Sequence, residues 1–136
     1  MKKPLRVLLI EDSEDDALLA VHELRRAGFE PDWSRVETEL DYLAHLEPTL
    51  DVILADYHLP QFDVLTALHR LQERGLDIPF IVVTGALGDE GAVECLRQGA
   101  TDYLLKDRLA RLGPAVDPWV SAAMVAADPA VISKAQ

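Results

Sequence analysis

Two kinds of segment alternate along the chain, short apolar runs and stretches with a helical spacing of apolar residues, and each kind occurs five times. Short apolar runs predict β-strands at 5–10, 32–36, 51–55, 79–83 and 102–105. Between them, apolar residues recur every three or four positions, which predicts helices. The helices are expected from Ser13 to Gly28, from Thr38 to Pro48, over about 63–74, over about 89–97, and from about 107–109 onward. This alternation predicts an α/β fold with a doubly wound parallel sheet and helices on both faces.

The character of the chain changes after Gly113. Pro114, Pro118 and Pro129 interrupt a stretch rich in Ala and Val, and proline inside a helix removes a backbone hydrogen bond. The fifth helix is therefore poorly defined by its sequence. With 136 residues the chain can form one core without disulfides. We expect one domain over 1–116 and a C-terminal extension over 117–136.

Charge and composition limit the function classes. The net charge of −11, with no basic stripe, should repel phosphate backbones and argues against direct nucleic-acid binding. No apolar run reaches the roughly 18 residues of a membrane span, and the N-terminus has no small-residue cleavage site. Cys95 is the single cysteine, so no intrachain disulfide can form. These features predict a cytoplasmic protein without a membrane partner.

Polar residues with complementary chemistry follow four of the apolar runs. Glu11 and Asp12 follow the first run, Asp56 the third, Thr84 the fourth and Lys106 the fifth. The ligand crevice of an open parallel sheet lies at the carboxyl ends of its strands, so these side chains should meet there. Each one alone is more often a helix cap, a turn residue or a solvated charge. Their joint occurrence at four strand ends indicates a site.

The chemistry of this set points to a divalent cation and a phosphoryl group. Clustered carboxylates repel one another, so a proton or a cation must balance them. Oxygen ligands favour Mg²⁺, which keeps several waters and completes its octahedron with phosphate oxygens. Lys106 could then neutralise one phosphate oxygen and Thr84 could donate to another. Asp56 could attack phosphorus and form an aspartyl phosphate.

Four segments of the chain carry a family resemblance, namely LLIEDSEDD, DVILADYHLP, IVVTGA and ATDYLLKD. In this order and spacing they resemble the receiver domain of two-component response regulators over about residues 5–112. The resemblance implies a flavodoxin-like fold with strand order 2-1-3-4-5. It also implies a signalling switch that catalyses its own phosphorylation and dephosphorylation; whether such a chain counts as an enzyme stays open.

The resemblance assigns the acceptor and the metal ligands. It makes Asp56 the phosphoacceptor and Asp12 a direct Mg²⁺ ligand, with Glu11 as its acidic partner. The backbone carbonyl of His58 becomes a further ligand.

The resemblance also assigns the switch residues, and the chain departs from the family pattern in two places. Thr84 and Lys106 become the hydroxyl and the amine that sense the phosphoryl group, and Tyr103 matches the aromatic switch position. Proline usually follows the lysine, often after a cis bond, but here the residue is Asp107. Many members have glycine at the end of the loop after the phosphoacceptor, where this chain has Val64.

The resemblance further implies partners. The phosphodonor would be a sensor histidine kinase or a histidine phosphotransfer protein, and the C-terminal half looks most like receivers associated with sensor kinases. The sequence contains no recognisable output domain, so we expect output through contact with a downstream protein effector. A homodimer through the face of the fourth helix, fifth strand and fifth helix is a further candidate.

Two other functions use related chemistry. A phosphatase of the haloacid dehalogenase type also has an aspartate nucleophile, but it normally has a second aspartate two positions later, where this chain has His58. A flavodoxin-like FMN carrier would have a phosphate loop rich in Ser, Thr and Gly after the first strand. The chain has EDSEDD there, which would repel a phosphate.

Overall fold

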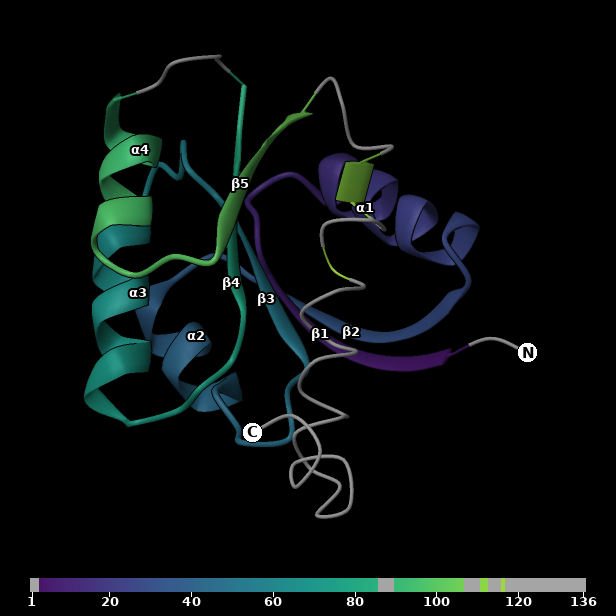
Figure 1. The fold of residues 1–136 in the computed structure, drawn as a ribbon, viewed down its shortest axis with the longest axis horizontal. Coiled ribbons are helices and arrows are strands. Elements are labelled where there is room, and N and C mark those ends of the chain that lie inside the picture. The colour runs from purple at the N-terminus through teal and green to yellow at the C-terminus, as the bar shows by residue number, and fades with distance from the viewer. Residues whose placement is uncertain (1–2, 86–89, 107–110, 113–115, 117–136) are drawn as a thin grey trace, which may run out of the picture.

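The computed structural model describes residues 3–85, 90–106, 111–112 and 116, and these form a three-layer α/β arrangement (Figure 1). The sheet has five parallel strands in the order β2-β1-β3-β4-β5. The strands are β1 Lys3–Ile10, β2 Phe29–Val36, β3 Val52–Asp56, β4 Phe80–Thr84 and β5 Asp102–Leu105. The helices are α1 Glu14–Arg26, α2 Glu39–His45, α3 Val64–Glu73 and α4 Glu90–Arg97. The predicted fold class and strand order are therefore confirmed.

The sheet separates two apolar cores. On one face α1 packs through Ala17, Ala20, Val21 and Leu24 against alternate residues of β1 and β3. On the other face lie α2, α3 and α4 (Figure 1), with Tyr42 and Leu68 among the fully buried side chains. Because both faces are covered, all five residues of β3 and all five of β4 are buried, as expected of central parallel strands.

The predicted starts of the first two helices are confirmed by their caps. The Ser13 hydroxyl accepts a hydrogen bond from the Asp16 N–H, and the Thr38 hydroxyl accepts one from the Asp41 N–H. After α1 the chain turns at Gly28, whose φ of 96° lies in the left-handed region that glycine adopts most easily. The short loop from α1 into β2 therefore depends on this residue.

The strand boundaries differ from the prediction in an informative way. β2 begins at Phe29, three residues before the predicted start, because it pairs in register with β1 from Lys3 onward. Pro31 is tolerated inside it since β2 is an edge strand. β3 and β4 each end one residue later than predicted, so Asp56 and Thr84 are the last residues of their strands. The predicted start of the fifth helix, and the departure at Asp107, lie outside the described residues.

Candidate functional site

The polar residues predicted to converge do lie at one edge of the sheet. Glu11 directly follows β1, Asp56 ends β3, Thr84 ends β4 and Lys106 directly follows β5. Lys106 Nζ lies 3.0 Å from Asp56 Oδ2 and 3.7 Å from Glu11 Oε2. Parallel pairing aligns the carboxyl ends of these strands, which brings together residues that are up to 95 positions apart.

Three carboxylates form an acidic cluster, which we define as Glu11, Asp12 and Asp56. One oxygen of each lies within 4.8 Å of the others. Glu11 and Asp56 are 7% and 3% exposed, whereas Asp12 is exposed to solvent. Oxygens around an octahedral Mg²⁺ lie roughly 3 to 4.2 Å apart, given Mg–O distances of about 2.1 Å. A small contraction, or water in some positions, would let the acidic cluster hold this ion.

Burial makes the ionisation of Glu11 unfavourable. The pKa of the Glu11 carboxyl rises from 4.5 to about 8, mainly because burial desolvates it, although the hydrogen bond from the Ser13 N–H opposes the rise. The charge of Asp56 contributes to this net rise, and the Lys106 ammonium opposes it. Without a bound metal ion, a proton on Glu11 therefore relieves part of the repulsion in the acidic cluster near neutral pH.

Lys106 is fixed as a cation at the centre of the site. Burial alone lowers the pKa of the Lys106 amine, but hydrogen bonds to Asp56 and Asp16 and the charge of Glu11 more than reverse this. The net pKa lies well above its ordinary range, so the amine stays protonated. A permanent positive charge beside Asp56 suits it to neutralise a developing phosphoryl oxyanion.

Asp16 is a site residue that the sequence reasoning missed. Its Oδ2 lies 3.0 Å from Lys106 Nζ, as close as the Asp56 oxygen. Helical periodicity carried a signal, because Asp16 stands four residues before the buried Ala20 and therefore on the inward side of α1. In the sequence Asp16 is hard to distinguish from Glu14 and Asp15, which carry the same charge in the same turn but are exposed to solvent.

His58 contacts Asp56 through its backbone. Its N–H donates to Asp56 Oδ1 at 3.1 Å, so both oxygens of Asp56 have partners. The imidazole is exposed and meets the Tyr57 ring edge to face, with centroids 4.9 Å apart. The Asp56 carboxylate is thus held in one orientation between the loop that follows it and Lys106.

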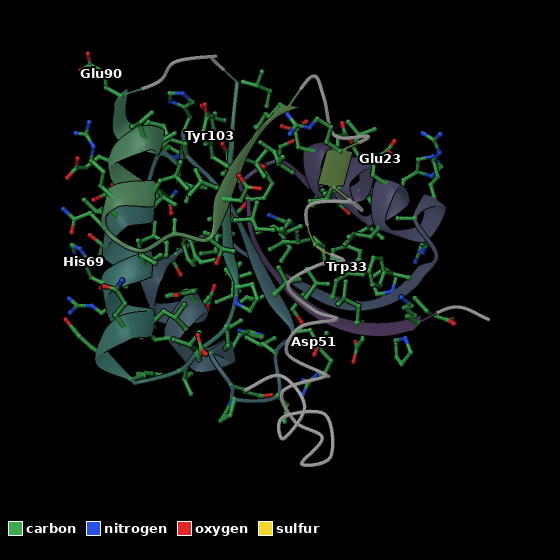
Figure 2. The ribbon with its side chains drawn as sticks, viewed as in Figure 1. Glu23, Trp33, Asp51, His69, Glu90 and Tyr103 are labelled. Atoms are coloured by element: carbon green, nitrogen blue, oxygen red, sulfur yellow. The ribbon has the colours of Figure 1, made fainter. Side chains whose placement is uncertain are left out.

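Thr84 and Tyr103 lie on the neighbouring strands β4 and β5. Thr84 is fully buried and pairs in register with Leu105, one residue before Lys106. Tyr103 pairs with Val82, is half-buried and packs on the face of the sheet that α4 covers (Figure 2). The two predicted switch residues therefore lie on adjacent strands between the site and α4.

Within the part of the chain that the structure describes, no helix combines the length and apolar character needed to cross a membrane.

Comparison with known proteins gives consistent matches. The family model of the response regulator receiver domain matches residues 7–116. The virulence transcriptional regulatory protein PhoP of Salmonella choleraesuis is 33% identical over 105 residues, which cover 75% of this chain and 45% of PhoP. The chain thus spans less than half the length of this relative.

Solved structures agree. A response regulator receiver domain protein from Clostridium thermocellum superimposes with a TM-score of 0.75 at 18% identity, covering 89% of this chain and 98% of that one. The receiver domain of the sensor histidine kinase PA1611 from Pseudomonas aeruginosa has a TM-score of 0.70 at 28% identity, covering 87% and 98%. In that structure a magnesium ion is coordinated in the active-site cleft.

Proposed function

Because this chain belongs to the response regulator receiver family, we propose that it is a Mg²⁺-dependent switch whose Asp56 accepts a phosphoryl group. The donor would be a sensor histidine kinase or a histidine phosphotransfer protein. One observation carries the proposal: the buried Asp56 carboxylate belongs to the acidic cluster and also lies 3.0 Å from the Lys106 ammonium.

This geometry supports the following transfer step. An Asp56 oxygen forms a bond to phosphorus, the bond from phosphorus to the donor nitrogen breaks, and the released imidazole keeps the nitrogen electron pair. Lys106 balances charge that develops on a phosphoryl oxygen, and the Thr84 hydroxyl can donate to another. Mg²⁺ held by the acidic cluster, with the His58 carbonyl as a further ligand, would neutralise charge on the transferred group. The protein contributes mainly position and charge.

The proposed output is a change in the α4–β5 face. Phosphorylation would draw Thr84 toward the phosphoryl group, and Tyr103 would fill the space that it leaves. A downstream protein effector, or a second copy of the chain, would bind one state of this face better than the other. PhoP is named a transcriptional regulator; the acidic character of this chain still favours a protein contact over a direct nucleic-acid contact for residues 1–116.

The phosphatase alternative predicts turnover instead of a stable phosphoprotein. It needs an acid to protonate a leaving alkoxide, and the side chain at that position is the exposed imidazole of His58. An FMN phosphate would meet three carboxylates where it needs donors. The receiver function therefore has the better chemical support.

One experiment separates these functions. The purified chain is incubated with Mg²⁺ and acetyl phosphate or phosphoramidate and then analysed by intact mass spectrometry. The expected result is one added phosphoryl group that is absent without Mg²⁺ and absent in Asp56→Asn. Rapid hydrolysis of a phosphomonoester without phosphoprotein accumulation would instead support the phosphatase.

A further inference from the structure

Lys106 forms an ion pair with a residue outside the strand ends. In the described part of the chain its Nζ contacts carboxylates from three elements: Glu11 after β1, Asp16 in α1 and Asp56 in β3. The contacts to Asp16 and Asp56 are both 3.0 Å long. Lys106 is thus held between the acceptor and the first turn of α1.

The first turn of α1 gives Asp16 a fixed position. Its backbone N–H donates to the Ser13 hydroxyl at 3.2 Å, which caps the helix. Its side chain, 40% exposed, reaches Lys106 from the edge of the site. Asp15 has the same charge one position earlier but is exposed to solvent. Asp15 and Asp16 therefore carry the same carboxylate, but only that of Asp16 contacts Lys106.

The apolar surroundings of the Lys106 ammonium increase the importance of its contact with Asp16. A cavity of about 50 Å³ lies between α1 and the sheet, and both Asp16 and Lys106 line it. Much of its remaining wall is apolar and includes Leu9, Ala17 and Ala20. An ammonium that lost Asp16 would face this wall on one side, with no other α1 carboxylate at contact distance among the described residues.

We infer that Asp16 is a positioning residue that anchors Lys106 beside Asp56 while the phosphoryl group is transferred, an inference that rests on the proposed function. Transfer changes the bonding of Asp56: an oxygen becomes bonded to phosphorus, and its charge moves onto the phosphoryl oxygens. Asp16 takes part in neither the bond that forms nor the bond that breaks. Its ion pair can therefore hold Lys106 in place while the partner of the ammonium changes from a carboxylate to a phosphoryl oxygen.

The test measures phosphorylation rates with acetyl phosphate by intact mass. In this reaction the Asp56 O–P bond forms, the acetyl O–P bond breaks and acetate leaves. At saturating Mg²⁺, Asp16→Asn should slow phosphorylation about two- to fivefold, the range expected from a partly exposed ion pair. Asp15→Asn removes the same charge and should leave the rate unchanged. Saturating Mg²⁺ excludes an effect that acts only through metal affinity.

A double-mutant cycle shows whether Asp16 acts through Lys106. In a Lys106→Met background, Asp16→Asn should produce no slowing, because the group that it positions is gone. Equal slowing in both backgrounds, or no difference between Asp16→Asn and Asp15→Asn, would overturn the inference. Asp16→Ala serves as a second variant, and thermal unfolding checks that each variant is folded. If the unmodified chain gains no phosphoryl group, or Asp56→Asn gains one equally well, the proposed function itself fails.

Discussion

The phenol ring of Tyr57 occupies the space that a side chain at Gly91 would need. A Cβ built on Gly91 would overlap the Tyr57 hydroxyl oxygen and ring carbon Cζ. Tyr57 directly follows Asp56, and Gly91 is the second residue of α4. The loop after the acceptor strand is therefore in direct contact with the backbone of α4, the helix beside the proposed output face.

This contact predicts that Gly91→Ala destabilises the chain when Tyr57 is present and does not destabilise it when Tyr57 is replaced by alanine. Gly91→Ala should lower the free energy of unfolding by about 1–3 kcal/mol, because the methyl group overpacks the Tyr57 ring. In a Tyr57→Ala background the overlap is gone, and the same change should be neutral or stabilising by up to about 1 kcal/mol. Urea unfolding curves with unchanged m-values measure both effects.

Gly85→Ala provides a control, since a Cβ at Gly85 meets nothing within 4 Å. It should cost much less than Gly91→Ala. Equal destabilisation by Gly91→Ala with and without the Tyr57 ring would show that the ring does not limit this position.

The sequence alone predicts the contacts that are set by sheet topology, but it does not predict those that depend on how individual side chains fit together. Strand ends in a parallel sheet converge by topology, so Glu11, Asp12, Asp56, Thr84 and Lys106 could be assigned to one site from their places in the pattern. The contact of Asp16 with Lys106 depends on how a helix turn faces the sheet across 90 residues of sequence. The fit of Tyr57 against Gly91 depends on the shape of one ring, which no hydrophobic pattern specifies.

Asp56→Asn should abolish phosphorylation and leave the fold intact. The amide keeps the size of the side chain, but it is a far weaker nucleophile than the carboxylate and attracts Lys106 less. Intact mass after incubation with Mg²⁺ and acetyl phosphate, together with a circular dichroism spectrum, measures both outcomes. Acid-labile phosphoryl incorporation in this variant at the rate of the unmodified chain would move the acceptor to another residue.

Mg²⁺ affinity should depend on Asp12 and not on its acidic neighbours. Asp12 belongs to the acidic cluster, whereas Glu14 and Asp15 are exposed residues of the first turn of α1. Asp12→Ala should weaken Mg²⁺ binding by more than about tenfold, since even groups behind the ligands contribute on that scale. Glu14→Ala and Asp15→Ala should each change it by less than about fivefold, as expected of a charge near a helix terminus.

A Mg²⁺ titration monitored by intrinsic fluorescence or by calorimetry compares the three variants at one ionic strength. Similar losses in all three would show that the acidic run attracts the cation diffusely.

The raised pKa of Glu11 predicts how stability depends on pH in the absence of Mg²⁺. With a pKa of about 8 in the folded chain and 4.5 as its ordinary value, Glu11 binds more protons folded than unfolded between these two pH values. Rising pH therefore lowers the free energy of unfolding across this window, by up to about 1.4 kcal/mol per pH unit from this group.

Glu11→Gln isolates the contribution of this carboxyl, because glutamine cannot ionise. The stability of the unmodified chain relative to Glu11→Gln should fall between pH 5.5 and 8 in EDTA. Saturating Mg²⁺ should reverse the trend, since the cation binds the ionised carboxylate. Parallel pH profiles of the two proteins in EDTA would show that Glu11 ionises normally.

His58 should control how long the phosphoryl group survives on Asp56. Its N–H already donates to Asp56 Oδ1, so its side chain leaves the loop close to the acceptor, and the imidazole is exposed to solvent. The residue two positions after Thr84 is Ala86, whose methyl side chain has no polar group to orient a hydrolytic water. A neutral imidazole can accept a proton near physiological pH.

His58→Ala should therefore slow hydrolysis of the phosphoryl group by about one hundredfold or more, the typical contribution of a general base. Both hydrolysis rates are compared from pH 5.5 to 8, and the difference between the two proteins gives the contribution of the imidazole. His69→Ala, at a half-buried imidazole on α3 (Figure 2), controls for the loss of a histidine elsewhere. The measurement follows loss of phosphate by intact mass after removal of the donor. An unchanged rate and pH profile in His58→Ala would restrict the part played by this residue to its backbone, which holds the acceptor carboxylate from one side while Lys106 holds it from the other.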